Sequence, residues 1–199
     1  MKLTSKMIAY FLVVVLVSFV GFAFSIFKVT GILDDTLNTQ NVEMPRFYQT
    51  TDMTYNTMEK VAQVRGFLLT GSDVHLQEFD QLAKTNTETE KALLAIMRTD
   101  KGKKLTGELL KLDTEFNELV TKKLVPLKKA GKDAEALQVH QNEVTPAAKI
   151  LGEKMEEYKV YRQDFLKGVF SRTIDNATAT RNAVILSMIL SVLVGILIG

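Results

Sequence analysis

Two long apolar runs without a charged residue lie near the ends of this 199-residue chain, and they constrain its fold more than any other feature. The first covers residues 7–27 and the second residues 183–199. A helix rises about 1.5 Å per residue, so the first run gives roughly 31 Å of helix and the second roughly 25 Å, against a hydrocarbon core of about 30 Å. We predict a transmembrane helix at each run, with a water-soluble segment over residues 28–182.

The charges beside the first run predict its orientation. Lys2 and Lys6 precede it, and the positive-inside rule therefore places residues 1–6 in the cytoplasm and residues 28–182 outside it. A cleaved signal peptide is the alternative, because Ala23-Phe24-Ser25 resembles a cleavage site, but the run exceeds the roughly 7–15 residues of a signal core. We expect a multi-pass protein of the inner (plasma) membrane that contacts lipid, with an output domain beyond residue 199.

Composition excludes several classes of function. The chain has no cysteine and two histidines, and neither histidine follows a glutamate by three residues, as in helical metal sites. Apart from Lys2 and Lys6, basic and acidic residues are equal in number, so no basic stripe predicts a nucleic-acid partner. The predicted core has neither paired carboxylates nor a nucleophile beside a base. We therefore expect no cofactor and no enzymatic activity.

Residues 28–182 read as helix almost throughout. Stop and cap signals interrupt the helical pattern at Gly71-Ser72-Asp73, at 99–102 and at Ala130-Gly131-Lys132-Asp133. Three turns divide the segment into four helices. The predicted fold class is therefore all-α, an antiparallel up-down four-helix bundle continuous with the two transmembrane helices.

Apolar positions recur four and three residues apart in each of the four helices, which is the period of helical bundles. This spacing predicts four core stripes. The stripes are Phe47, Thr51, Thr54, Met58, Val61, Arg65 and Leu68; His75, Phe79, Leu82, Asn86, Thr89, Leu93 and Ile96; Leu105, Leu109, Leu112, Phe116 and Leu119; and Val144, Ala148, Leu151, Met155, Tyr158, Arg162, Phe165 and Val169.

Three prolines lie within these helical patterns, and Pro146 is the hardest to accommodate. A proline inside a helix removes a backbone hydrogen bond and costs about 3 kcal/mol unless the helix bends or restarts. We expect one of those outcomes, and a restart would make residues 133–144 a separate short helix. Pro146 would also leave the carbonyl of Asn142 without its helical donor.

Several motifs resemble those of the sensor region of bacterial methyl-accepting chemotaxis receptors. They are a short basic N-terminus before one membrane helix, Met44-Pro45, the sequence Arg-Gly-Phe-Leu-Leu-Thr-Gly over residues 65–71 with Phe79 two turns later, and the turn at 131–136. Helical sensors of histidine kinases and cyclases share the 65–71 motif. The resemblance implies a homodimeric periplasmic or extracellular bundle that binds a small ligand or a periplasmic binding protein and signals through the second membrane helix.

The resemblance also implies a ligand site. Family members that bind amino-acid carboxylates place arginines of the first helix opposite a threonine of the fourth, near the outer end of the bundle. Arg65 and Thr145 lie about 56 and 57 Å from the membrane runs by helical rise, so they match in height, and Gln141 is one turn away. The nearest other arginine on that helix, Arg46, is about 28 Å lower, which leaves open a smaller anion, a partner protein or no direct ligand.

Each candidate residue also has a structural interpretation. Arg65 and Arg162 occupy predicted core positions, where a guanidinium needs a carboxylate, water or a ligand, or reaches the edge of the bundle. His75 and His140 are expected to be solvated, or otherwise to sense pH. Asn86 and Thr89 are expected to set helix register rather than to bind ligand. The alternatives to a chemoreceptor are the same sensor module on a histidine kinase or cyclase, and a ligand-free membrane-tethered adaptor.

Overall fold

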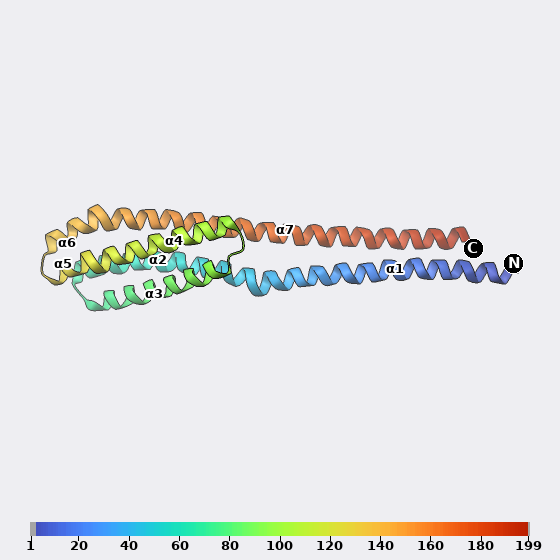
Figure 1. The fold of residues 1–199 in the computed structure, drawn as a ribbon, viewed down its shortest axis with the longest axis horizontal. Helices are drawn as coiled ribbons and strands as arrows, with labels where there is room; N and C mark the ends of the chain where they lie inside the picture. Colours follow the sequence, from blue (N-terminus) through green and yellow to red (C-terminus); the bar gives the residue numbers. More distant parts are fainter. Residues whose placement is uncertain (1–2, 199) are drawn as a thin grey trace. The chain divides into compact units, whose positions relative to one another are not determined.

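The computed structural model describes residues 3–198, and every regular element in that range is a helix (Figure 1). The protein is therefore all-α. The α-helices are α1 (Leu3–Asn38), α2 (Met44–Thr70), α3 (Asp73–Ile96), α4 (Asp100–Leu119), α5 (Val125–Lys129), α6 (Asp133–Val139) and α7 (Thr145–Ile198). Three π-helices lie between them, η1 (Thr39–Glu43), η2 (Val120–Leu124) and η3 (His140–Val144).

The chain divides into two compact units, which we describe separately. The central unit is Pro45–Phe165. The terminal unit combines the residues up to Met44 with those from Leu166 onward.

The three predicted turns of the central unit are confirmed. Gly71 and Gly131 adopt φ values of 69° and 74°, the left-handed conformation that ends a helix and that glycine adopts without steric cost. Ser72 caps α3 by accepting a hydrogen bond from the backbone nitrogen of Val74 at 3.4 Å. Thr99 caps α4 in the same way, accepting from the Gly102 nitrogen at 3.1 Å.

Each proline of the chain follows a π-helix. Pro45, Pro126 and Pro146 are the second residues of α2, α5 and α7, directly after η1, η2 and η3. The residue before each proline donates its N–H to the carbonyl five residues back, for example Thr145 to His140. This wider turn lets the backbone pass a residue that cannot donate. Residues 133–144 thus form α6 and η3, and helical structure continues through Pro146 as α7, which begins at Thr145.

The predicted core stripes are largely confirmed in α3, α4 and α7. The buried apolar cluster of the central unit draws on α2, α3, α4, η2, η3 and α7. Its members are Met53, Val64, Phe67, Phe79, Leu93, Met97, Leu105, Leu109, Phe116, Val120, Leu124, Val144, Leu151, Met155 and Tyr158.

Along α2 the predicted stripe was wrong by one residue. The buried positions are Thr50, Met53, Thr57, Lys60, Val64 and Phe67. Met58, predicted as core, is 67% exposed, and Arg65 is exposed as well. The face of α2 toward its neighbours therefore includes a lysine.

Side-chain hydrogen bonds show which residues of α2 and α3 lie at the same level. The Asn56 amide donates to Asn86 Oδ1 at 3.0 Å, and Gln63 Oε1 lies 2.6 Å from His75 Nδ1. Residue numbers thus rise along α2 as they fall along α3. Gly66 lets the His75 ring approach, because a Cβ on Gly66 would lie 2.6 Å from His75 Cε1.

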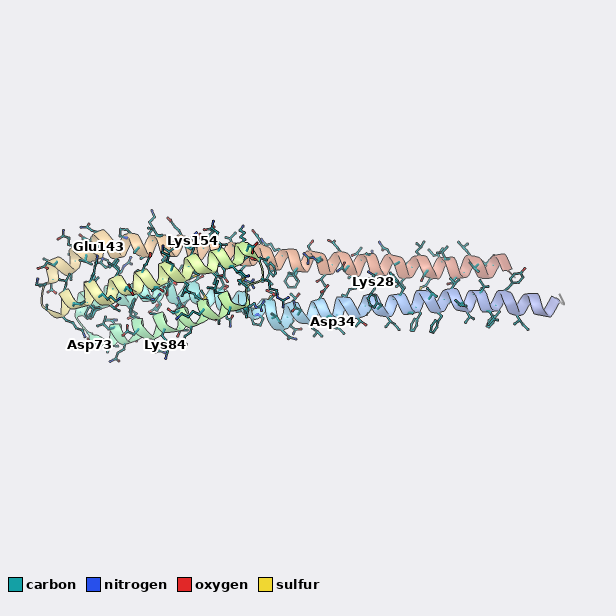
Figure 2. The ribbon with its side chains drawn as sticks, in the orientation of Figure 1. Lys28, Asp34, Asp73, Lys84, Glu143 and Lys154 are labelled. Atoms are coloured by element: carbon teal, nitrogen blue, oxygen red, sulfur yellow. The ribbon has the colours of Figure 1, made fainter. Side chains whose placement is uncertain are left out.

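Two contacts show which residues of α4 and α7 lie at the same level. Lys154 donates to Glu108 Oε2 at 2.9 Å, and Tyr161 Oη lies 2.5 Å from Thr99 Oγ1. Figure 2 labels Lys154 on α7. Residue numbers therefore rise along α4 as they fall along α7.

The terminal unit exposes nearly all its apolar side chains. The helical stretches Tyr10–Thr70 and Asp133–Ile196 each contain a window long and apolar enough, by length and composition, to cross a membrane. Small residues lie where α1 meets the end of α7. Ser18 Oγ donates to Ser191 Oγ at 3.3 Å, and a Cβ on Gly21 would lie 3.2 Å from Ser187 Oγ. Such small residues let apolar helices approach closely.

Candidate functional site

A pocket of about 370 Å³ opens in the central unit between α2 and the segment that joins η3 to α7. It is partly polar and partly apolar. Its lining residues are Met58, Val61, Val64, Arg65, His140, Val144, Thr145, Ala148 and Lys149.

The polar part of the pocket is cationic. Arg65 and Lys149 both line it, and none of its lining residues in the described part of the chain is acidic. The nearest carboxylate oxygen of Glu153 is 3.8 Å from Lys149 Nζ, in an exposed pair that is strongly screened by solvent. A guanidinium offers a planar fork of N–H donors, which suits carboxylate or another oxyanion. The pocket is therefore chemically suited to an anion.

His140 adds a titratable group to this pocket. Its partial burial lowers the pKa of the imidazole, and the positive charge of Arg65 lowers it further. Thr145 Oγ1 lies 3.5 Å from His140 Nδ1, so the hydroxyl and the imidazole are neighbours. A neutral imidazole can accept or donate a hydrogen bond, whereas an anion bound beside Arg65 would favour its protonation.

The structure brings two of the three predicted ligand residues together. Arg65 and Thr145 line the same pocket, although Arg65 lies on the exposed edge of α2 rather than in the core. Gln141 is exposed and is not among the lining residues. His140, expected only to be solvated or to sense pH, takes the place predicted for Gln141. His75 is half-buried against Gly66, outside the pocket.

Arg162 is buried on α7, as its stripe position predicts. Its guanidinium carbon lies 5.2 Å from the centre of the Phe165 ring, and Arg162 has polar neighbours as well. Tyr158 lies one turn before it, and burial raises the pKa of the Tyr158 phenol. Both side chains are therefore interpreted as parts of the core packing.

Sequence reasoning missed an ionic cluster inside the central unit. Lys60 of α2 and Asp113 of α4 form a salt bridge in which both side chains are fully buried. Lys60 Nζ also donates to Asn117 Oδ1 at 3.2 Å, and the Asn117 amide donates to Asp113 Oδ2 at 3.1 Å. A second acid, Glu90 of α3, is also fully buried in this unit.

Glu90 differs from Lys60 and Asp113 in its hydrogen bonding and its charge. Neither of its carboxyl oxygens has a hydrogen-bond partner among the described residues. Burial, and secondarily the negative charge of Asp113, raises the pKa of Glu90 to about 8, while the charge of Lys60 lowers it in part. Near neutral pH the side chain is therefore mostly a neutral acid.

Asn86 makes the interhelical contact that its stripe position predicts. Its amide donates to the Met53 carbonyl at 3.2 Å and to Thr57 Oγ1 at 3.1 Å. Thr89 instead donates within its own helix, to the Thr85 carbonyl at 2.8 Å. Of Asn86 and Thr89, only Asn86 makes the predicted contact between α3 and α2.

No group of three or more His, Cys, Asp or Glu side chains that could hold a metal ion occurs within the described range. Comparison with protein-family models, curated proteins and solved structures gives no match. The pocket, the ionic cluster and the apolar helices are therefore the features that bear on function.

Proposed function

We propose that this protein is the transmembrane sensor module of a chemoreceptor, which binds a small anion outside the cytoplasm and transmits the signal by helix displacement. The observation that carries the proposal is the cationic pocket shared by Arg65, His140, Thr145 and Lys149. The two apolar helical windows support the membrane location and lipid contact. A loaded binding protein that presents a carboxylate is an alternative ligand for the same charges.

The proposed architecture is an antiparallel four-helix bundle continuous with two transmembrane helices. The opposite order of contacts between α2 and α3, and between α4 and α7, supports it. Continuity is supported by α7, which extends as one helix from Thr145 to Ile198. The N-terminal lysines support an orientation in which the bundle lies outside the cytoplasm.

In this mechanism the anion bridges α2 and α7. A ligand that prefers one packing of Arg65 against Thr145 shifts α7 along its axis, and packed helices move by about 1–2 Å in such transitions. A coupling free energy of roughly 1–3 kcal/mol is sufficient. A cytoplasmic signalling domain would receive this displacement.

We expect oxyanions and small organic acids to raise the thermal unfolding midpoint of the full chain in detergent micelles, in a screen that also includes amino acids. A ligand at about 100 times its Kd stabilises by about 2.7 kcal/mol, which corresponds to roughly 5–11 °C for a chain of this size. Arg65→Ala is expected to weaken binding by about 10–100-fold, the effect of losing a charge-assisted hydrogen bond.

Binding is also expected to strengthen at acidic pH, because the bound anion raises the pKa of His140, which is low in the free protein.

Arg98→Ala is the matched control, since Arg98 is exposed in the turn between α3 and α4 and does not line the pocket. This variant should bind as the wild type does. An anion whose affinity is unchanged by Arg65→Ala contradicts the site. If no anion, amino acid or binding protein stabilises the chain, the adaptor alternative is favoured instead.

We also propose that the protein is a homodimer that uses the exposed stripe of α2. Tyr48, Tyr55, Met58 and Leu69 recur at heptad spacing and are 57, 65, 67 and 85% exposed. Exposed apolar side chains on one helix face are typical of an interface with a second copy. Arg65 belongs to the same stripe, so the second copy would cover the pocket.

Because the chain has no cysteine, single-cysteine variants test the dimer directly. Under mild oxidation Met58→Cys is expected to form a disulfide-linked dimer in most chains, because the same residue of two copies meets near a two-fold axis. Lys84→Cys is the control, since the Lys84 side chain is 77% exposed on α3 (Figure 2). Equal cross-linking of both variants contradicts an interface along α2.

A further inference from the structure

Glu90 is a buried acid of the central unit that has no hydrogen-bonding partner among the described residues. It is 0% exposed, and both its oxygens lack a hydrogen bond within residues 3–198. Leaving a charged carboxylate in such a place is far more costly than leaving a neutral one. The packing around Glu90 is therefore compatible with the neutral acid and unfavourable to the carboxylate.

The charged residues around Glu90 show why Lys60 does not balance a negative charge on Glu90. Lys60 of α2 and Asp113 of α4 are the charged groups that act on it, and they already form a buried pair with each other. Tyr158 and Arg162 of α7 are also buried, but neither is among the charged groups that shift the pKa of Glu90. One cation therefore serves two acids, and only a proton on Glu90 balances the cluster Lys60–Glu90–Asp113.

We propose that Glu90 is a proton-binding site that makes the packing of α3 against α2 and α4 respond to pH. With the proton bound, the cluster is neutral and the helices pack as described. When the proton is lost, an unpaired negative charge remains in the core, and Glu90 competes with Asp113 for Lys60. That competition weakens the contacts of α3. Sensing of external pH specifically rests on the proposed topology, whereas the proton site itself does not.

The sign of the effect follows from linkage. The pKa of Glu90 is about 8 in the folded protein and near its usual value of 4.5 when unfolded, so the folded state binds more protons between these values. The contribution of Glu90 to stability is therefore greatest below about pH 4.5, falls through the interval, and is constant again above about pH 8. Each pH unit in this interval changes the unfolding equilibrium about tenfold.

Glu90→Gln tests the proposal, because glutamine keeps the size of the protonated acid and cannot ionise. Unfolding of the full chain in detergent micelles is measured by denaturant titration from about pH 5 to about pH 8. The ratio of the wild-type unfolding constant to that of E90Q is expected to rise at least a hundredfold across this range. Taking the ratio removes the titration of all other groups.

Glu88→Gln on the same helix is the matched control, since the Glu88 side chain is 67% exposed. Its pH profile should be parallel to that of the wild type. A constant ratio between wild type and E90Q overturns the proposal. So does an E90Q chain that is less stable than the wild type at about pH 8, because the carboxylate would then be stabilising.

Two further measurements test the proton and the movement separately. Infrared difference spectra should contain a protonated-carboxyl band near neutral pH that E90Q lacks, and its absence from the wild type overturns the proton site.

Spin labels at Asp52→Cys and Lys84→Cys, both at exposed positions, report the α2–α3 distance. We expect this distance to change between about pH 6 and pH 9 in the wild-type background but not with E90Q. An unchanged distance overturns the switch.

Discussion

Lys60→Met is expected to destabilise the central unit by about 3–5 kcal/mol, one of the two largest losses we predict from a single substitution. Methionine fills a space similar to that of the lysine stem, so little of this loss comes from a cavity. The loss arises because Asp113 remains fully buried without its cation, while Glu90 loses the one charge that favours its ionised form. Asp113 must then either take up a proton or remain as an uncompensated charge.

Denaturant unfolding of the full chain in micelles measures this loss as a shift in the free energy of unfolding. The exposed pair of Lys84 with Glu88, at 4.0 Å, provides the control, and Lys84→Met should change stability by less than about 0.5 kcal/mol. The double variant Lys60→Met with Asp113→Leu should recover most of the stability, since well-packed apolar residues replace buried ion pairs at little net loss. A Lys60→Met loss below about 1 kcal/mol contradicts the buried pair.

The helix boundaries were predictable because they depend on local chemistry. Gly71 and Gly131 take up left-handed conformations that few other residues adopt, and Ser72 and Thr99 supply side-chain oxygens to the first turn of the next helix. None of these signals needs tertiary information. Sequence patterns could therefore locate every turn of the central unit.

The buried ions were missed for a specific reason, which recurs in three helices. At each position the apolar or neutral neighbour of a buried charged residue was taken as the core residue. Val61 was preferred to Lys60, Thr89 to Glu90, and Leu112 to Asp113. Stripe spacing alone is compatible with both choices, since adjacent residues differ by about 100° around the helix. Burial of a charge becomes reasonable only when its partner on another helix is known.

The candidate pocket was partly predictable from helical rise. Arg65 and Thr145 lie in regular helix, so counting about 1.5 Å per residue from the two apolar runs brought them to the same level. Gln141 lies in η3, where the wider turn changes the angular position of each residue relative to α-helical counting. His140 consequently lines the pocket instead. The effect of Pro146 on backbone geometry, rather than a break in the helix, explains the difference.

Phe116→Ala is expected to destabilise the central unit by about 3–5 kcal/mol, because it removes a fully buried ring. The Phe116 ring is tilted by 53° against Phe79 at 6.1 Å between centroids, and Lys60 Nζ lies 5.6 Å from its centre. The ring thus connects the apolar core to the ionic cluster. Its loss removes apolar contacts and also part of what separates the Lys60–Asp113 pair from water.

Comparison with Phe116→Leu and Phe170→Ala distinguishes these contributions. Leucine restores most of the apolar volume but not the aromatic face, so it should lose less than alanine and still weaken the environment of Lys60. Phe170 is 48% exposed, and its truncation should cost about 1 kcal/mol or less. If Phe116→Ala and Lys60→Met combine with a loss much smaller than the sum of the two, the ring and the ion pair act as one coupled unit. Fully additive losses would instead mean that the aromatic core and the ionic cluster stabilise the helices independently.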